Sequence, residues 1–214
     1  MAVYSYYYGA SSEKGIGIRA QSPELQSLPL ASELQELASM HALESSEHSG
    51  EMLSFLLERD GYSILGVSYI ESPKSSGYNR SAPCSLQYIA PMQDLDKAAP
   101  ELSRIINFVN FQKPNSATPQ AMKHWPLNES GYYFHNSPSV LAPLVDGMVR
   151  VALSTKKEEE VLLIGLPKGK NSEYAFARYT IAELMAYLPV PLRANIHFFT
   201  GLPVAEGGDR KSVV

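Results

Sequence analysis

The sequence predicts a mixed α+β fold, in which antiparallel strands and hairpins come first and a helix-strand-helix-strand order follows. Short alternating or aromatic runs, separated by residues that favour turns, dominate the first half of the chain. In the second half, apolar residues recur at helical spacing over 138–152 and 173–187, with a continuous apolar run at 161–165 between them. Strand-rich and helix-rich halves of this kind indicate an α+β or mixed α/β architecture.

The chain has 214 residues, of which 44% are hydrophobic, and a formal net charge of −4. This length suits one domain over 1–205, with the possibility of two lobes, 1–95 and 96–205, that share a core. We expect the polar, glycine-rich residues 206–214 to be a linker. The charge gives no reason to expect a nucleic-acid partner. No apolar run is long enough to cross a membrane, and one cysteine, Cys84, suits a reducing cytoplasm.

An N-terminal hairpin is the first expected unit. Residues 3–10 alternate and are rich in tyrosine, which predicts a strand, and 16–20 can form the returning strand after a turn. Gly17 within the second strand suggests a bulge or a close backbone approach. A helix with apolar residues at helical spacing is expected to follow over 30–41.

A three-stranded antiparallel meander should come next. Asp60-Gly61 lies between two apolar runs, 53–58 and 62–70, and this dipeptide is the strongest short-range signal of a hairpin. A loop rich in Ser, Gly, Pro and Asn then leads into a third strand over 84–89.

A proline opens the next helix and a polar segment follows it. Pro100 occupies a favoured first helical position, and the apolar face of this helix runs to Val109. Residues 112–128 are rich in Pro, Asn and Lys and are the best candidate for a linker or an excursion. Trp125 within them is either an exposed anchor for a partner or a buried residue that holds the loop to the body. The second alternative is favoured because large aromatic residues are mostly buried.

The C-terminal half is expected to begin with Ser137-Pro138 as the N-cap and first residue of a helix. The second helix, 173–187, ends in two closely spaced prolines, and a short connection then carries Arg193. We expect the aromatic strand 195–200 to be a buried, central member of the sheet.

Motifs for cofactor binding fail on inspection, so no cofactor is expected. Residues 165–172 lie where a phosphate loop would, but the spacer is one residue short and Asn171 replaces the hydroxyl residue. Pro167 also removes a backbone donor. Gly15-Ile16-Gly17 lacks the third glycine of a dinucleotide-binding turn.

Catalytic and metal-binding sets are not apparent either. Cys84 lies in an apolar strand, which favours a buried structural cysteine over a nucleophile. The five histidines show no metal-ligand spacing. Two alternatives stay open: a hydrolase that uses Cys84 or a histidine, and a small-ligand sensor whose pocket is lined by the strand over 4–8.

Short patterns that carry a family resemblance are spread over nearly the whole chain, at 6–10, 15–25, 59–61, 76–80, 188–193 and 196–200. They resemble the N-terminal domains of bacterial GTPase-associated proteins. Such domains belong to multidomain proteins encoded beside a small GTPase-like NTPase in predicted conflict (anti-phage defence) operons. In two places this chain departs from the family pattern: Tyr8-Gly9-Ala10 replaces a Tyr-x-Ser form, and Cys84 begins a stretch where the family often has a histidine.

The resemblance implies a non-catalytic adaptor or sensor module, with no catalytic residue to transfer. Its partners would be other domains of the same polypeptide and the GTPase-like NTPase, with neither a membrane nor a nucleic acid, and its oligomeric state stays open. The candidate interaction residues are Tyr8, Gly9, Gly17, Ser22, Pro23, Arg80, Trp125 and Arg193.

Overall fold

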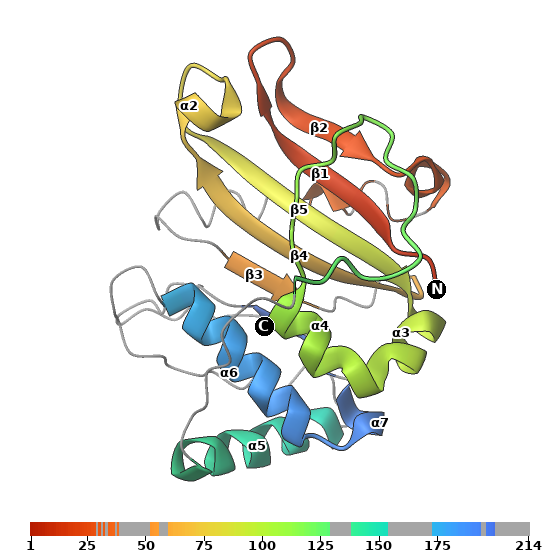
Figure 1. Ribbon diagram of the computed structural model, residues 1–214, viewed down its shortest axis with the longest axis vertical. Coiled ribbons are helices and arrows are strands. Elements are labelled where there is room, and N and C mark those ends of the chain that lie inside the picture. Colours follow the sequence, from red (N-terminus) through yellow and green to blue (C-terminus); the bar gives the residue numbers. More distant parts are fainter. Residues whose placement is uncertain are drawn as a thin grey trace.

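A computed structural model gives the fold and confirms its mixed α+β class (Figure 1). The predictions for the helical cap at Ser137, the strand 161–165, the linker 206–214 and much of the helix 30–41 lie outside the residues that it describes. Those residues are 1–28, 30, 32, 34–36, 38, 52–55, 60–128, 138–153, 173–193 and 196–199.

The strands form one sheet in the order β2-β1-β5-β4-β3-β6, and each neighbouring pair is antiparallel. The predicted N-terminal hairpin, β1–β2, and the predicted meander, β3-β4-β5, are both confirmed. The strand bounds are Tyr4–Ser11 (β1), Gly15–Gln21 (β2), Met52–Phe55 (β3), Tyr62–Glu71 (β4), Ala82–Pro91 (β5) and Phe198–Phe199 (β6).

The two hairpins follow their turn chemistry. Asp60 and Gly61 both have positive φ, 51° and 81°, as a hairpin turn between right-twisted strands requires. In the N-terminal hairpin the register shifts between Tyr7 and Tyr8, which leaves Arg19 as the extra residue of β2. The bulge predicted at Gly17 is therefore displaced by two residues.

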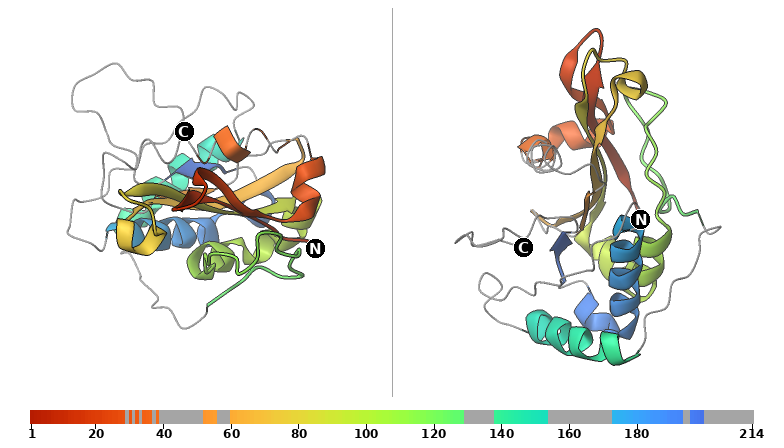
Figure 2. Two further views of the ribbon diagram at one scale, coloured as in Figure 1. Left: turned by 90° about the horizontal axis from the view of Figure 1, so that it is seen from above. Right: turned by 90° about the vertical axis from the view of Figure 1, so that its left-hand side faces the viewer.

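Helical segments lie at both ends of the molecule and against both faces of the sheet (Figures 1 and 2). The helix expected to open at Pro100 begins earlier, at Met92, because Pro100 lies in a 3₁₀ turn that joins two shorter helices. The bounds are Pro23–Ser27 (η1), Pro73–Ser76 (α2), Met92–Ala98 (α3), Ala99–Glu101 (η2), Leu102–Phe108 (α4), Pro138–Leu153 (α5), Glu173–Tyr187 (α6) and Val190–Arg193 (α7).

Both faces of the sheet are covered, so the strands carry apolar residues on two sides. On the first face, α3, α4 and α6 pack on the sheet; on the second, η1 and the segment around Leu34 do so (Figure 2). The buried residues of the first face include Leu65, Val67, Leu86, Leu102, Ile106 and Leu184, and those of the second are Tyr6, Tyr8, Leu25, Leu30, Leu34, Ala38, Ile64 and Ile89.

Residues 112–128, which we call the strap, form the predicted excursion. The strap lies along the first face of the sheet, over β1 and β5 (Figures 1 and 2). Val3 and Met122 exchange two backbone hydrogen bonds of 2.9 and 2.8 Å, and the Gln21 amide donates to the Ala117 carbonyl at 3.1 Å. These bonds make the strap part of the folded body, which removes its interpretation as a linker.

The strand predicted over 195–200 is shorter and less central than expected. Within the described residues it is the two-residue β6, which pairs with β3 at one end of the strand order. The connection before it is the one-turn helix α7, since the Leu192 amide donates to the Pro189 carbonyl at 2.9 Å.

Candidate functional site

The end of the sheet formed by the β1–β2 turn and the β4-α2-β5 connection is called the distal end below (Figure 1). Its first turn is closed by local bonds: the Lys14 amide donates to Ser11 Oγ at 3.1 Å, and Gly15 has a φ of 67°. Arg19 Nε donates to the Gly9 carbonyl at 3.0 Å, and its Nη2 donates to the Gly15 carbonyl. The hairpin tip is thus held by its own bulged arginine.

The second part of the distal end is the reversal between β4 and β5. Pro73 begins α2, where its missing N–H costs nothing, and Gly77 ends it in the left-handed conformation with φ 67°. The Gly77 amide donates to the Pro73 carbonyl at 3.1 Å. This tight turn places Tyr78 and Asn79 beside the β1–β2 turn.

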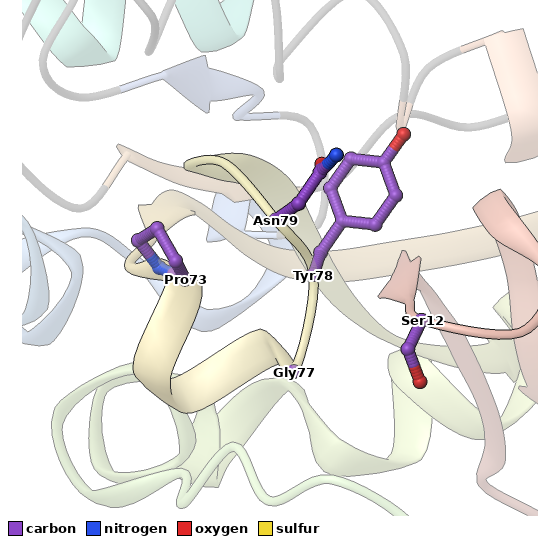
Figure 3. Close-up of a pocket in the computed structure, with 5 residues that line it drawn as sticks. All are labelled: Ser12, Pro73, Gly77, Tyr78 and Asn79. Carbon is purple, nitrogen blue, oxygen red and sulfur yellow. The ribbon is translucent and has the colours of Figure 1, made fainter.

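A surface hollow of about 340 Å³ lies between these two turns (Figure 3). The side chains of Ser12 and Tyr78 point in opposite directions, so the lining groups do not converge on one point (Figure 3). Its residues are Ser12, Pro73, Gly77, Tyr78 and Asn79. A hollow of this kind can hold part of an extended chain, but it lacks the converging polar groups of a catalytic pocket.

Cationic residues adjoin the lining residues of the hollow along the chain. Lys74 and Arg80 are chain neighbours of its lining residues, and Lys14 lies two residues from Ser12. The Arg80 guanidinium carbon lies 5.8 Å from the centre of the Tyr78 ring, within the range of a cation–π contact. Arg80 is exposed, so its charge is available to a ligand at this rim.

Under the strap, next to the distal end, titratable side chains gather on the first face of the sheet. Lys113 of the strap forms an ion pair with Glu71 at the end of β4, and its ammonium lies 5.5 Å from the centre of the Tyr7 ring. Tyr69 forms a hydrogen bond with Cys84 on the neighbouring strand. Glu71 is only 6% exposed, and its Oε2 atom is buried and has no hydrogen-bond partner among the described residues.

The pKa values in this cluster shift for definite physical reasons. Burial raises the pKa of both Tyr7 and Tyr69, and the nearby Cys84 and Glu71 add to the increase. Partial burial of Lys113 acts to lower its pKa, but the hydrogen bond to Glu71 and the neighbouring Tyr7 outweigh this effect and raise it. The cluster therefore holds neutral tyrosines around one charged pair.

Two of the predicted site residues, Gly9 and Gly17, lie opposite each other on β1 and β2. A Cβ on Gly9 would lie 2.8 Å from Cε2 of Tyr7, so only glycine fits beneath that ring. A Cβ on Gly17 would meet only Arg19 Nη2, at 3.9 Å. Gly9 is thus required by packing against the tyrosine, whereas Gly17 is not required by a close contact.

Tyr8, Ser22 and Pro23 lie on or beside the second face of the sheet. Tyr8 is 9% exposed and packs in that core, and Ser22 is fully buried and accepts a hydrogen bond from the Ser5 amide at 3.0 Å. Pro23 is exposed at the first position of η1. Of the three, only Pro23 is open to a partner.

The burial of Trp125 decides between the two alternatives for this residue. Its side chain is 6% exposed and packs in the first-face core, so it is not an exposed partner anchor; it holds the strap to the body. Its Nε1 atom is buried, and the part of the chain that the structure describes offers it no hydrogen-bond partner.

Arg193 binds the ends of two helical segments. Its Nη2 donates to the Ala186 carbonyl at 3.0 Å and its Nε to the Leu188 carbonyl, also at 3.0 Å, at the end of α6. Its Nη1 donates to Pro100 in η2 at 2.9 Å. Carbonyls at a helix C-terminus lack intrahelical partners, so a guanidinium satisfies them well. The arginine and the hairpin tip lie at opposite ends of the molecule (Figure 1).

The described residues place Cys84 in the core and form no cluster of metal ligands. Cys84 is fully buried, as the sequence favoured, and among these residues no group of three or more His, Cys, Asp and Glu is placed to hold a metal ion. None of the described helices has the length and apolar character needed to cross a membrane.

Comparisons with family models, with curated proteins and with solved structures gave no match for this chain. The resemblance to GTPase-associated N-terminal domains therefore stays a prediction.

Proposed function

We propose that the chain is a non-catalytic interaction module that acts as an adaptor in a larger bacterial protein. Its partners are sister domains of that polypeptide and a GTPase-like NTPase of a conflict (anti-phage defence) system, and its location is the cytoplasm. The family resemblance supports this choice of partners. The lack of converging catalytic groups at the distal hollow supports a binding role.

One observation carries the proposal: β2 is a terminal strand of the sheet and exposes two large apolar residues. Ile16 and Ile18 are 39% and 38% exposed and, two residues apart on a strand, lie on the same face. Such an edge can accept a further strand through main-chain hydrogen bonds, with alternate side chains setting specificity. The strap forms a backbone hydrogen bond with this strand at Gln21, whose amide donates to the Ala117 carbonyl.

The proposed surface includes the hairpin edge but excludes Arg193, which lies at the opposite end of the molecule and is occupied with helix carbonyls (Figure 1). Tyr8 and Ser22 are likewise committed to the core. Among the predicted interaction residues, Gly17 is the one that β2 places between the two exposed isoleucines.

Calorimetric titration of the purified chain with the GTPase-like NTPase encoded beside it tests the proposal, with GDP and with a non-hydrolysable GTP analogue. We expect a complex whose affinity falls at least about tenfold in the double variant Ile16→Lys/Ile18→Lys. Both apolar contacts of the β2 edge are lost in that variant, and two charges take their place. Leu153→Lys, at a 62% exposed site on α5, is the matched control. No complex, or equal loss in the control, would rule the proposal out.

A further inference from the structure

The charged residues beside the distal hollow are mostly positive, whereas the chain as a whole is acidic. Three exposed cations, Lys14, Lys74 and Arg80, lie within two residues of its lining residues in the chain, and Glu13 is the one exposed acid among the described residues of these two turns. The chain as a whole has a net charge of −4. A local cationic rim on an acidic protein attracts an anionic ligand and disfavours other orientations of approach.

Among the described residues, Lys14, Lys74 and Arg80 form no ion pair. The Arg80 guanidinium carbon lies 5.8 Å from the centre of the Tyr78 ring. By contrast, the ammonium of Lys113 and the guanidinium of Arg19, which lie nearby, are occupied by Glu71 and by backbone carbonyls. The positive charges beside the hollow can therefore bind an external anionic group.

The hollow between the cations suits an extended peptide. The hydroxyls of Ser12 and Tyr78 and the amide of Asn79 make no hydrogen bond to the described part of the chain, so they can bind a main chain. Pro73 and the Tyr78 ring add apolar area. A nucleic acid is disfavoured, because its long phosphate backbone would extend from this small rim over a protein that is acidic overall.

From these observations we propose that the distal hollow is a docking site for an acidic peptide segment of a partner protein. The acidic side chains bind Lys14, Lys74 and Arg80, and the peptide backbone lies over Tyr78 and Asn79. This inference rests on the proposed interaction function and adds the chemistry of the segment that is bound.

Fluorescence anisotropy of the full chain with fluorescein-labelled decaglutamate tests the site. We expect saturable binding that weakens as ionic strength rises past about 0.1 M, where charges are screened beyond about 10 Å. Lys74→Gln and Arg80→Gln should each weaken binding about twofold to fivefold, the range for exposed charge contacts. Lys97→Gln, a 77% exposed lysine on α3 away from the distal end, should leave it unchanged.

Changes in the backbone amide chemical shifts during titration with decaglutamate show where the peptide binds. Shifts centred on Ser12, Gly77 and Asn79 support the site. No binding, an equal effect of Lys97→Gln, or shifts centred elsewhere would overturn it, as would tighter binding of a thymidine decamer. If decaglutamate fails to bind while the NTPase complex forms and depends on Ile16 and Ile18, this inference fails and the proposed function stands. The reverse result would keep the acidic-peptide site and remove the NTPase partner.

Discussion

The Tyr7 ring lies against the backbone of Gly9, two residues further along β1, and leaves no room for a side chain there. The ring is itself buried and has Lys113 above it, so it cannot easily turn away. Gly9→Ala should therefore lower the free energy of unfolding by about 1 to 3 kcal/mol, the usual cost of overpacking.

Gly17→Ala is the control for this change, because a Cβ there has only one atom within 4 Å and the backbone has no positive φ. It should be neutral or stabilise slightly, by less than about 1 kcal/mol. Urea denaturation of both variants measures the difference, and equal midpoints would contradict the packing argument.

Replacement of Lys113 should destabilise the protein and loosen the strap. Lys113→Met leaves the buried Glu71 carboxylate without its partner, and we expect a loss of about 1 to 3 kcal/mol, discounted because the lysine is partly exposed. Arg150→Gln, which breaks a pair of exposed groups with Asp146, should cost less than about 1 kcal/mol.

Trp125 is the one tryptophan of the chain and reports on the strap directly. Acrylamide should quench its fluorescence more strongly in Lys113→Met than in the Arg150 variant. Unchanged quenching together with unchanged stability would show that the ion pair does not hold the strap.

Stability should fall as the pH rises above about 10. The pKa values of Tyr7, Tyr69 and Lys113 are all raised in the folded state, so the folded protein holds protons that the unfolded chain releases above the ordinary values of 10.0 and 10.5. The stabilisation is complete below those values and is lost above them.

Tyr69→Phe tests this directly, because it removes one of the shifted groups. Between pH 8 and about 10.5 its urea midpoint should fall less than that of the wild type. In Tyr187→Phe, at a 59% exposed position, the urea midpoint should change with pH as it does in the wild type. Parallel curves for all three proteins would contradict the assignment.

Arg193 should act through stability. Arg193→Gln removes hydrogen bonds to carbonyls at the end of α6 and in η2, and a loss of about 2 to 3 kcal/mol is expected. Arg193→Lys should not restore it, because a lysine cannot reproduce the planar fork of donors. Thermal unfolding checks this, and wild-type stability in both variants would show that the contacts matter little.

Local chemistry made the hairpins and the two long helices α5 and α6 predictable, whereas the short helical segments η1, α2, α3 and α7 were not predicted. Asp60-Gly61 has the backbone that its residue types favour, and the stripe over 138–152 forms α5. The cluster under the strap had no such signal, because Lys113 and Glu71 are 42 residues apart and each is unremarkable among its neighbours. The sequence also did not predict where the last strand lies in the sheet. The aromatic residues that predicted a central strand form the short β6 at one end of the strand order.

The sheet joins β1 to β5, segments separated by most of the first half of the chain. During synthesis, a nascent polypeptide that has not reached residue 91 has no complete β5 to pair with β1. Tyr7 on the first face of β1 then also lacks Lys113 of the strap above its ring, and non-local pairing of this kind slows folding. Chaperone capture on the ribosome would be most valuable in that interval, before the second half of the chain emerges.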